Sequence, residues 1–179
     1  MKVWGIVGWK NAGKTGLMER LVAEFVRRGM TVSTVKHAHH AFDVDQPGKD
    51  SHRHRVAGAS EVLLSSGQRW ALMAELRGAG EPDLDTLLDK LSPVDLALVE
   101  GFKSGGHPKI EAHRGETGAA LLAPDMPTVR AIASDNGAAH AHLSTFDLDD
   151  TGAIADFIAA EGAEEHDDAE NECRQGDLH

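Results

Sequence analysis

Apolar runs and a helical apolar pattern alternate at the start of the chain. Residues 2–8, KVWGIVG, form a short apolar run that is typical of a buried strand. Residues 14–28 place apolar side chains on one helical face, and Gly29 follows as a stop signal. These side chains are Leu17, Met18, Leu21, Val22 and Phe25. Residues 30–36, MTVSTVK, are a second, β-branched run, so the unit predicts a parallel sheet with a right-handed crossover.

Similar patterns predict the elements of the remaining chain. A turn at QPGKD precedes a short helix from Asp50 or Ser51 to about Gly58. Leucines at helical spacing behind Pro82 and Asp83 predict a helix with Leu84, Leu87, Leu88 and Leu91, and another helix is expected at about 150–160. Further strands are predicted at 60–65, 69–75, 95–100, 109–113 and 128–133. The pattern favours one α/β domain over residues 1–161, with a mostly parallel sheet flanked by helices.

The stretch between the first strand and the first helix carries a recognisable chemistry. GWKNAGKT, residues 8–15, matches the phosphate-loop pattern G-x-x-x-x-G-K-[ST]. A Cβ at Gly8 or Gly13 would obstruct the tight loop or the approach of a phosphate. The following helix offers free N-terminal amides, Lys14 adds a charge near the β- and γ-phosphates, and the Thr15 hydroxyl suits Mg²⁺. The motif, strand and helix together predict a three-layer fold of the phosphate-loop NTPase type, whereas a fortuitous turn is the alternative.

A bound Mg²⁺ needs further oxygen ligands, which such folds supply from an acid at the tip of a strand next to the first. LALVEG ends in Glu100 and Gly101, which makes Glu100 the candidate for a water-mediated metal contact or for orienting an attacking water. Asp43 and Asp45, after the second strand, are the next metal candidates. The competing interpretations are a surface carboxylate for Glu100 and an exposed turn for the two aspartates.

Histidines and cations concentrate in residues 36–55, KHAHHAFDVDQPGKDSHRHR. The histidines are His37, His39, His40, His52 and His54. They favour a cationic wall for a second phosphorylated ligand. A transition-metal site is a second interpretation, although HAHH lacks the spacing of a defined site, and ordinary surface or core histidines are a third.

Charge and cysteine content narrow the class of protein. The formal net charge is −11, and residues 162–179 hold seven acidic residues against Arg174. This acidity argues against general nucleic-acid binding, and the composition of 162–179 predicts a disordered acidic tail. Cys173 has no partner for a disulfide, and the first apolar run is too short for a membrane span or signal peptide. We therefore expect a cytoplasmic protein that binds no membrane.

Several stretches together resemble a known family. GWKNAGKT, VKHAHHAFDVDQPGKDSHRHRVAGA, LALVEGFK, KIEAHR and AIASD are similar to the molybdopterin-guanine dinucleotide biosynthesis adaptor family, MobB, and the likeness runs from residue 1 to about 160. It implies a GTP-binding α/β protein that dimerises by extending its sheets, hydrolyses GTP weakly or not at all, and assists the guanylyltransferase of the molybdenum cofactor. A pterin-type phosphate is the second ligand that this role implies.

The resemblance also implies site residues. Those that would hold the phosphates are Gly8, Asn11, Ala12, Gly13, Lys14, Thr15 and Gly16. Glu100 and Gly101 would face Mg²⁺ and the γ-phosphate, and Asp135 would accept from the guanine N1 and N2 hydrogens, which match a carboxylate. The available arginine donors, Arg53 and Arg55, form no obvious arginine finger, so we expect slow turnover.

Two other function classes compete with an adaptor. A small-molecule kinase on the same fold would carry an arginine-rich lid, but ELRGAGEPD offers only Arg77. A nickel-chaperone GTPase would carry a terminal histidine tract, whereas the histidines here lie inside the fold.

Overall fold

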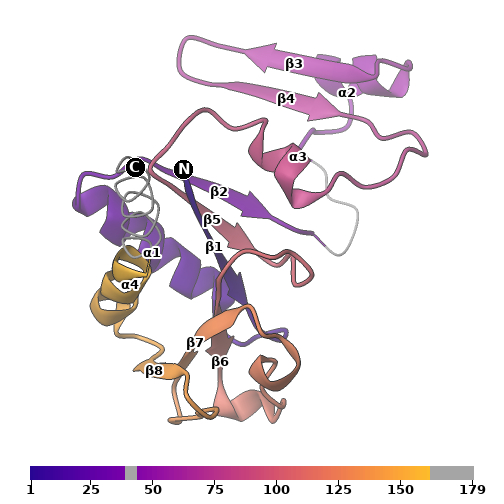
Figure 1. The fold of residues 1–179 in the computed structure, drawn as a ribbon. Helices are drawn as coiled ribbons and strands as arrows, with labels where there is room; N and C mark the ends of the chain where they lie inside the picture. Colours follow the sequence, from indigo (N-terminus) through magenta and orange to yellow (C-terminus); the bar gives the residue numbers. More distant parts are fainter. Residues whose placement is uncertain (39–43, 162–179) are drawn as a thin grey trace, which may run out of the picture. The chain divides into compact units, whose positions relative to one another are not determined.

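Two compact units make up the chain in the computed structural model, which describes residues 1–38 and 44–161 (Figure 1). The first is formed by described residues of Met1–His37 and Leu87–His179, and the second by those of Ala38–Thr86. The acidic tail at 162–179 lies outside the described residues, so its predicted disorder stays a prediction.

The first unit is built on a parallel sheet of six strands in the order β2-β5-β1-β6-β7-β8 (Figure 1). The strands are β1 Lys2–Val7, β2 Val32–Lys36, β5 Leu96–Glu100, β6 Lys109–His113, β7 Val129–Ser134 and β8 Ser144–Asp147. The parallel sheet confirms the predicted fold class. Sequence analysis missed β8, because STFD is a short edge strand whose only apolar side chain is Phe146.

Helices α1, Lys14–Arg27, and α4, Thr151–Ala160, pack on one face of this sheet. Trp4 and Ile6 point to the same face, where they meet Leu21 and other fully buried side chains of the helices. The opposite face holds a smaller apolar cluster with Val7 and Ile132, which includes Ala123 of the 3-10 turn η2, Ala123–Asp125. Another 3-10 turn, η1, spans Gly115–Thr117. Burial on both faces explains the continuous apolar strands.

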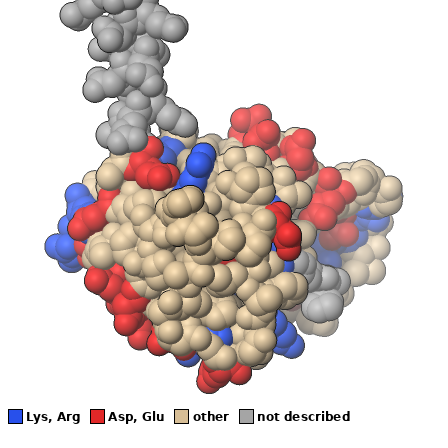
Figure 2. All heavy atoms as spheres, turned by 60° about the horizontal axis from the view of Figure 1, so that its bottom comes forward, with Lys and Arg blue, Asp and Glu red and all other residues tan. Residues whose placement is uncertain are grey.

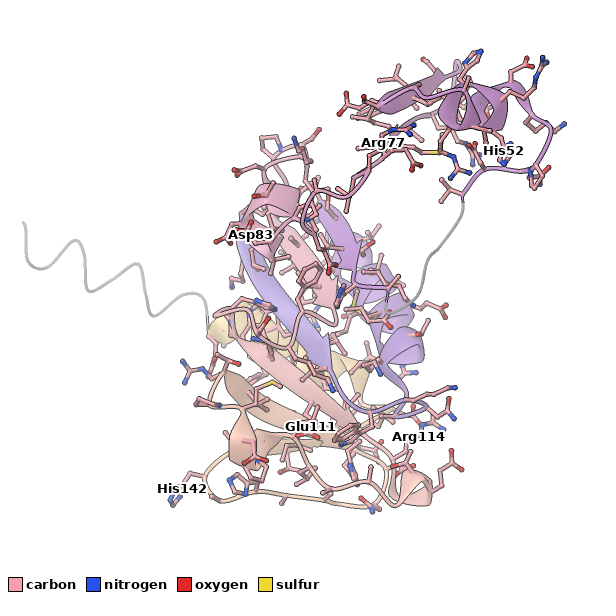
Figure 3. The ribbon with its side chains drawn as sticks, turned by 90° about the vertical axis from the view of Figure 1, so that its right-hand side faces the viewer. His52, Arg77, Asp83, Glu111, Arg114 and His142 are labelled. Carbon is pink, nitrogen blue, oxygen red and sulfur yellow. The ribbon has the colours of Figure 1, made fainter. Side chains whose placement is uncertain are left out.

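Strand β6 places three polar side chains inside the molecule, and local loops satisfy two of them, Lys109 and Glu111. Lys109 and Glu111 are fully buried, and His113 is 7% exposed. The two Glu111 carboxylate oxygens accept from the amides of Leu122 and Ala123 at 2.7 and 2.8 Å, which caps the start of η2. Glu111 therefore holds the β6–β7 connection against the sheet (Figure 3).

Lys109 of β6 holds the loop between β5 and β6 in place through hydrogen bonds. The Lys109 ammonium donates to the carbonyls of Gly105 and His107 and to the Thr128 hydroxyl. Burial lowers the pKa of Lys109 to about 8. His107 lies over Gly5 of β1, where a Cβ would come within 2.6 Å of its Nε2, so the glycine makes room for the imidazole.

His107 predicts an acid-sensitive contribution to stability. Burial, reinforced by the nearby Lys109 charge, lowers its pKa to about 4 from the ordinary 6.5. Between these values the unfolded chain binds more protons at this residue, so the free energy of unfolding falls as pH is lowered from 6.5 through 4. We expect the slope of the unfolding free energy against pH to be smaller in His107→Leu than in the parent protein, by the equivalent of roughly one bound proton at most. Urea unfolding across that pH window measures the slope.

The control for this prediction is His142→Leu, which removes an exposed imidazole of the same unit. The control should keep the pH slope of the parent protein. Equal slopes for His107→Leu and the parent protein would contradict the assignment.

The second unit consists of α2, Asp50–Val56, a hairpin of β3, Glu61–Ser65, and β4, Trp70–Ala74, and the start of α3, Leu84–Leu88. The hairpin is antiparallel and forms its own two-stranded sheet. Arg77 donates to the carbonyls of Arg55 and Ala59 and so joins the end of α2 to the chain that follows β4 (Figure 3). Helix α3 ends at Leu88, one turn before the predicted Leu91.

Candidate functional site

The loop from Gly8 to Gly13 joins β1 to α1, as the motif requires. Gly8 has a φ of +148°, and a Cβ there would lie 2.3 Å from the Ala112 carbonyl oxygen of β6. Gly13 has a φ of +92° and Asn11 a φ of +65°, both in the left-handed region. The loop conformation itself therefore demands the two glycines, independently of any ligand.

Lys14 folds back over this loop. Its ammonium donates to the carbonyls of Gly8, at 3.0 Å, and Trp9, at 2.7 Å. Burial lowers the pKa of Lys14, the Glu100 charge opposes this, and Lys103 and Lys36 add to the lowering. An anion at the loop would counter both the burial and the repulsion among the lysines.

Glu100 stands at the end of β5, the strand that pairs with β1 on one side. Its Oε1 lies 3.5 Å from the Thr15 hydroxyl oxygen and 3.2 Å from the Lys36 ammonium. The structure thus brings together the hydroxyl and the carboxylate that were predicted for Mg²⁺. Gly101 turns the chain sharply with a φ of +93°, and a Cβ there would approach the His37 Cβ to 2.9 Å.

The Thr15 hydroxyl and the Glu100 carboxylate fit a magnesium ion whose other ligands are water and phosphate oxygens. Mg²⁺ commonly takes one or two protein oxygens and completes its octahedron with water and phosphate oxygens. Among the described residues there is no group of three or more His, Cys, Asp or Glu side chains arranged to hold a metal by themselves. Thr15 and Glu100 are the residues that would supply the protein oxygens of such a shared site.

Trp9 and Lys103 form a wall of the site that sequence analysis did not assign. The Lys103 ammonium lies 4.5 Å from the centroid of the Trp9 ring, and the Trp9 indole N–H donates to the Ala120 carbonyl at 2.7 Å. Lys103 stands three residues after Glu100 within LALVEGFK. Its position in that stretch was the available signal, but only the fold shows that it faces the phosphate loop.

Asp135 follows β7 directly, at the same edge of the sheet. Its Oδ1 accepts from the Gly115 amide at 2.8 Å, and the residue is exposed. The adjacent turn is ordered by the Ser134 hydroxyl, which donates to Asn136 Oδ1 at 2.6 Å and accepts from the Ala138 amide at 3.2 Å. Among the described residues, the second Asp135 oxygen has no hydrogen-bond partner.

Two predicted metal candidates come from the segment after β2. Asp43 lies outside the described residues, as do His39 and His40. Asp45 belongs to the second unit, where its carboxylate accepts from the Ser51 hydroxyl at 2.7 Å and from Arg55 Nε at 3.2 Å. Its part in metal binding stays a prediction.

The predicted arginine donors also belong to the second unit. Arg55 pairs with Asp45 and, at 3.3 Å, with Glu75, so its guanidinium is engaged within that unit. Arg53 lies 3.8 Å from Asp50 on the exposed side of α2. The described contacts therefore give Arg55 a structural explanation.

Arginine does reach the phosphate loop, but from a different element. Arg114 follows β6 and lies beside the loop after β1 (Figure 3), next to Gly13. Arg114 is the last residue of the stretch KIEAHR, and the sequence alone predicted no role for it.

Acidic side chains dominate the rim of the face shown in Figure 2, with separate basic residues among them. This distribution agrees with the net charge of −11. Among the described residues, no helix combines the length and apolar character that crossing a membrane requires.

Known proteins resemble this chain in sequence and in fold. Residues 3–135 match the family described as MobB, molybdopterin guanine dinucleotide synthesis protein B. The molybdopterin-guanine dinucleotide biosynthesis adapter protein of Haemophilus influenzae is 39% identical over 86% of this chain and 85% of its own length. The Escherichia coli protein of the same name is also 39% identical, over 84% of this chain and 87% of its own.

Solved structures show the same fold. The crystal structure of a MobB homolog from Bacillus stearothermophilus covers 90% of this chain and 97% of its own, with a TM-score of 0.67 and 28% identity. Relatives at 39% identity and a shared fold across nine-tenths of the chain leave little room for a different architecture.

Proposed function

This chain belongs to the MobB family of adapter proteins in molybdopterin-guanine dinucleotide biosynthesis, and from that premise we propose that it acts as a GTP-binding adapter. The observation that carries the proposal is the Gly8–Gly13 loop, whose strained backbone is closed over by the Lys14 ammonium at the start of α1. Such a loop with an adjacent helix N-terminus provides amides and positive charge for a triphosphate. Family membership favours this role over a small-molecule kinase or a nickel chaperone.

Magnesium belongs to the same proposal. Thr15, at the start of α1, and Glu100, at the end of β5, offer oxygen ligands from two neighbouring elements, and Lys36 balances the Glu100 charge at 3.2 Å. Bound Mg²⁺ would neutralise phosphate charge, while Glu100 would hold a metal-bound or attacking water in position. We expect slow hydrolysis at most, so that binding rather than turnover is the output of the site.

The experiment that tests this function is a calorimetric titration of the full chain with GTP and with ATP, each with and without Mg²⁺. We expect GTP to bind, Mg²⁺ to strengthen binding, and ATP to bind more weakly. No detectable binding of either nucleotide at millimolar concentration would contradict the proposal.

Asp135 is proposed to read the guanine base. In Asp135→Asn, the amide oxygen still accepts from Gly115, but one carboxylate acceptor for the base hydrogens becomes a donor. We expect the preference for GTP over ATP to fall by roughly tenfold, measured by the same titrations. Asp125→Asn, which alters an exposed aspartate elsewhere in the unit, should leave the preference unchanged.

The adapter role further implies a partner enzyme, the guanylyltransferase of the molybdenum cofactor, and a pterin-type phosphate ligand.

We also propose a homodimer. Its support is the β3–β4 hairpin of the second unit, which exposes four large apolar side chains by 44–65%. They are Leu63, Leu64, Trp70 and Leu72. An apolar hairpin of this kind is a typical surface for association between copies of a chain.

A further inference from the structure

The guanidinium of Arg114 lies against the phosphate loop. Arg114 is the first residue after β6, and a Cβ built on Gly13 would lie 3.0 Å from its Nε and 3.7 Å from its Nη2. The absence of a side chain at Gly13 thus lets this cation approach the end of the loop, directly before α1. Lys14 supplies one positive charge to the loop from the helix, and Arg114 supplies another from the neighbouring strand.

The hydrogen-bonding capacity of Arg114 is incompletely used. Its Nε is buried and has no hydrogen-bond partner among the described residues. Its Nη1 lies 3.9 Å from Glu116 Oε1, which is too long for a hydrogen bond, and both side chains are partly exposed. A buried donor without an acceptor is costly, and this cost disappears when an anion supplies the acceptor.

The strand order indicates which part of a nucleotide would meet this donor. Along the carboxyl edge of the sheet, Glu100 ends β5, the phosphate loop follows β1, Arg114 follows β6 and Asp135 follows β7. A nucleotide with its γ-phosphate toward Glu100 and its base toward Asp135 spans these strands in sequence. The groups that lie between the loop and the base are the α-phosphate and the ribose, and of these two the α-phosphate is the anion that a guanidinium binds.

We propose that Arg114 binds the α-phosphate of the guanine nucleotide through its guanidinium N–H groups. This inference rests on the proposed GTP binding and specifies a residue of that same site. It also couples the two ends of the site, because the next residue, Gly115, donates its amide to Asp135. The phosphate contact at Arg114 and the base contact at Asp135 therefore come from two segments that this hydrogen bond joins.

The test is calorimetric titration of Arg114→Gln with GTP, GDP and GMP, in the presence of Mg²⁺. Loss of a charge-assisted contact to the α-phosphate, which all three nucleotides carry, should weaken all three alike, by roughly ten- to a hundredfold. Arg114→Lys keeps the charge but loses Nε and the planar fork, so it should fall between the parent protein and Arg114→Gln. Urea unfolding of the nucleotide-free variants should show little loss of stability, because Nε has no partner to lose.

Arg130→Gln is the matched control. Arg130 is an exposed arginine of β7, near the opposite end of that strand from Asp135, so the variant makes the same charge change away from the site. It should bind GTP and GDP as the parent protein does.

Distinct results separate this inference from the function on which it rests. Full GTP and GDP affinity in Arg114→Gln, with binding lost in Lys14→Ala, would overturn the Arg114 assignment and leave the proposed function intact. Weaker GTP with unchanged GDP would place the contact at the γ-phosphate, and weaker GTP and GDP with unchanged GMP would place it at the β-phosphate; either result would also overturn it. A parent protein that binds neither nucleotide would overturn both.

Discussion

Replacing Lys14 with alanine is expected to lower the affinity for GTP by on the order of a hundredfold or more, because several charge-assisted phosphate contacts disappear together. Isothermal titration calorimetry of the full chain in the presence of Mg²⁺ measures the effect. The folded structure should persist, since Lys14 is only partly buried and bonds to two loop carbonyls that solvent can also satisfy. Its lowered pKa indicates that the charge is poorly accommodated without an anion.

Lys10→Ala provides the control for Lys14→Ala. Lys10 is an exposed lysine of the same loop, so its removal makes the same change in net charge. We expect its loss to change GTP affinity by less than about threefold, as for a solvent-screened charge. If Lys14→Ala bound GTP as tightly as Lys10→Ala, the phosphate loop would not be the nucleotide site.

Replacing Gly8 with alanine is expected to destabilise the fold itself. The added Cβ would lie 2.3 Å from the Ala112 carbonyl oxygen, a backbone atom of β6 that cannot turn away, and φ is +148°. We expect the free energy of unfolding to fall by about 2–4 kcal/mol, and the midpoint of thermal unfolding by roughly 5–15 °C. Calorimetry or circular dichroism in the absence of nucleotide measures this loss.

Gly29→Ala separates the collision from the backbone strain. Gly29 also has a positive φ, +84°, but a Cβ there has nothing within 4 Å. Its substitution should therefore cost only the conformational strain, about 1 kcal/mol. Equal losses for the two variants would show that the packing of Gly8 against β6 contributes nothing to stability.

Local patterns were sufficient for most of the fold. The first strand, the glycine loop and α1 follow directly from apolar periodicity and from the motif, because each depends on residues that are close in sequence. The short strand β8 was missed for the complementary reason. Its pairing with β7 comes from the sheet, whereas its four residues carry little apolar signal of their own.

Site residues divide in the same way. Lys14 and Thr15 could be assigned from sequence, since the motif places them at the start of the helix. The metal role of Asp45 stays a prediction, and the described carboxylate is bound to Ser51 and Arg55. Lys103 and Arg114 were not assigned, because no local pattern marks a residue that meets the loop from another strand. Trp9 was not assigned because it stands at a position of the loop that the motif leaves open.

For this protein, the order of residues alone specified the phosphate loop, its helix and the acid that closes β5. Tertiary structure was needed to bring Thr15 to Glu100, 85 residues away, and Arg114 to Gly13. The physical reason is that a parallel sheet gathers the ends of its strands at one edge, in an order set by strand pairing and not by sequence. The local motif therefore determines the phosphate loop of the candidate site, and the topology of the sheet adds the residues that are distant in sequence.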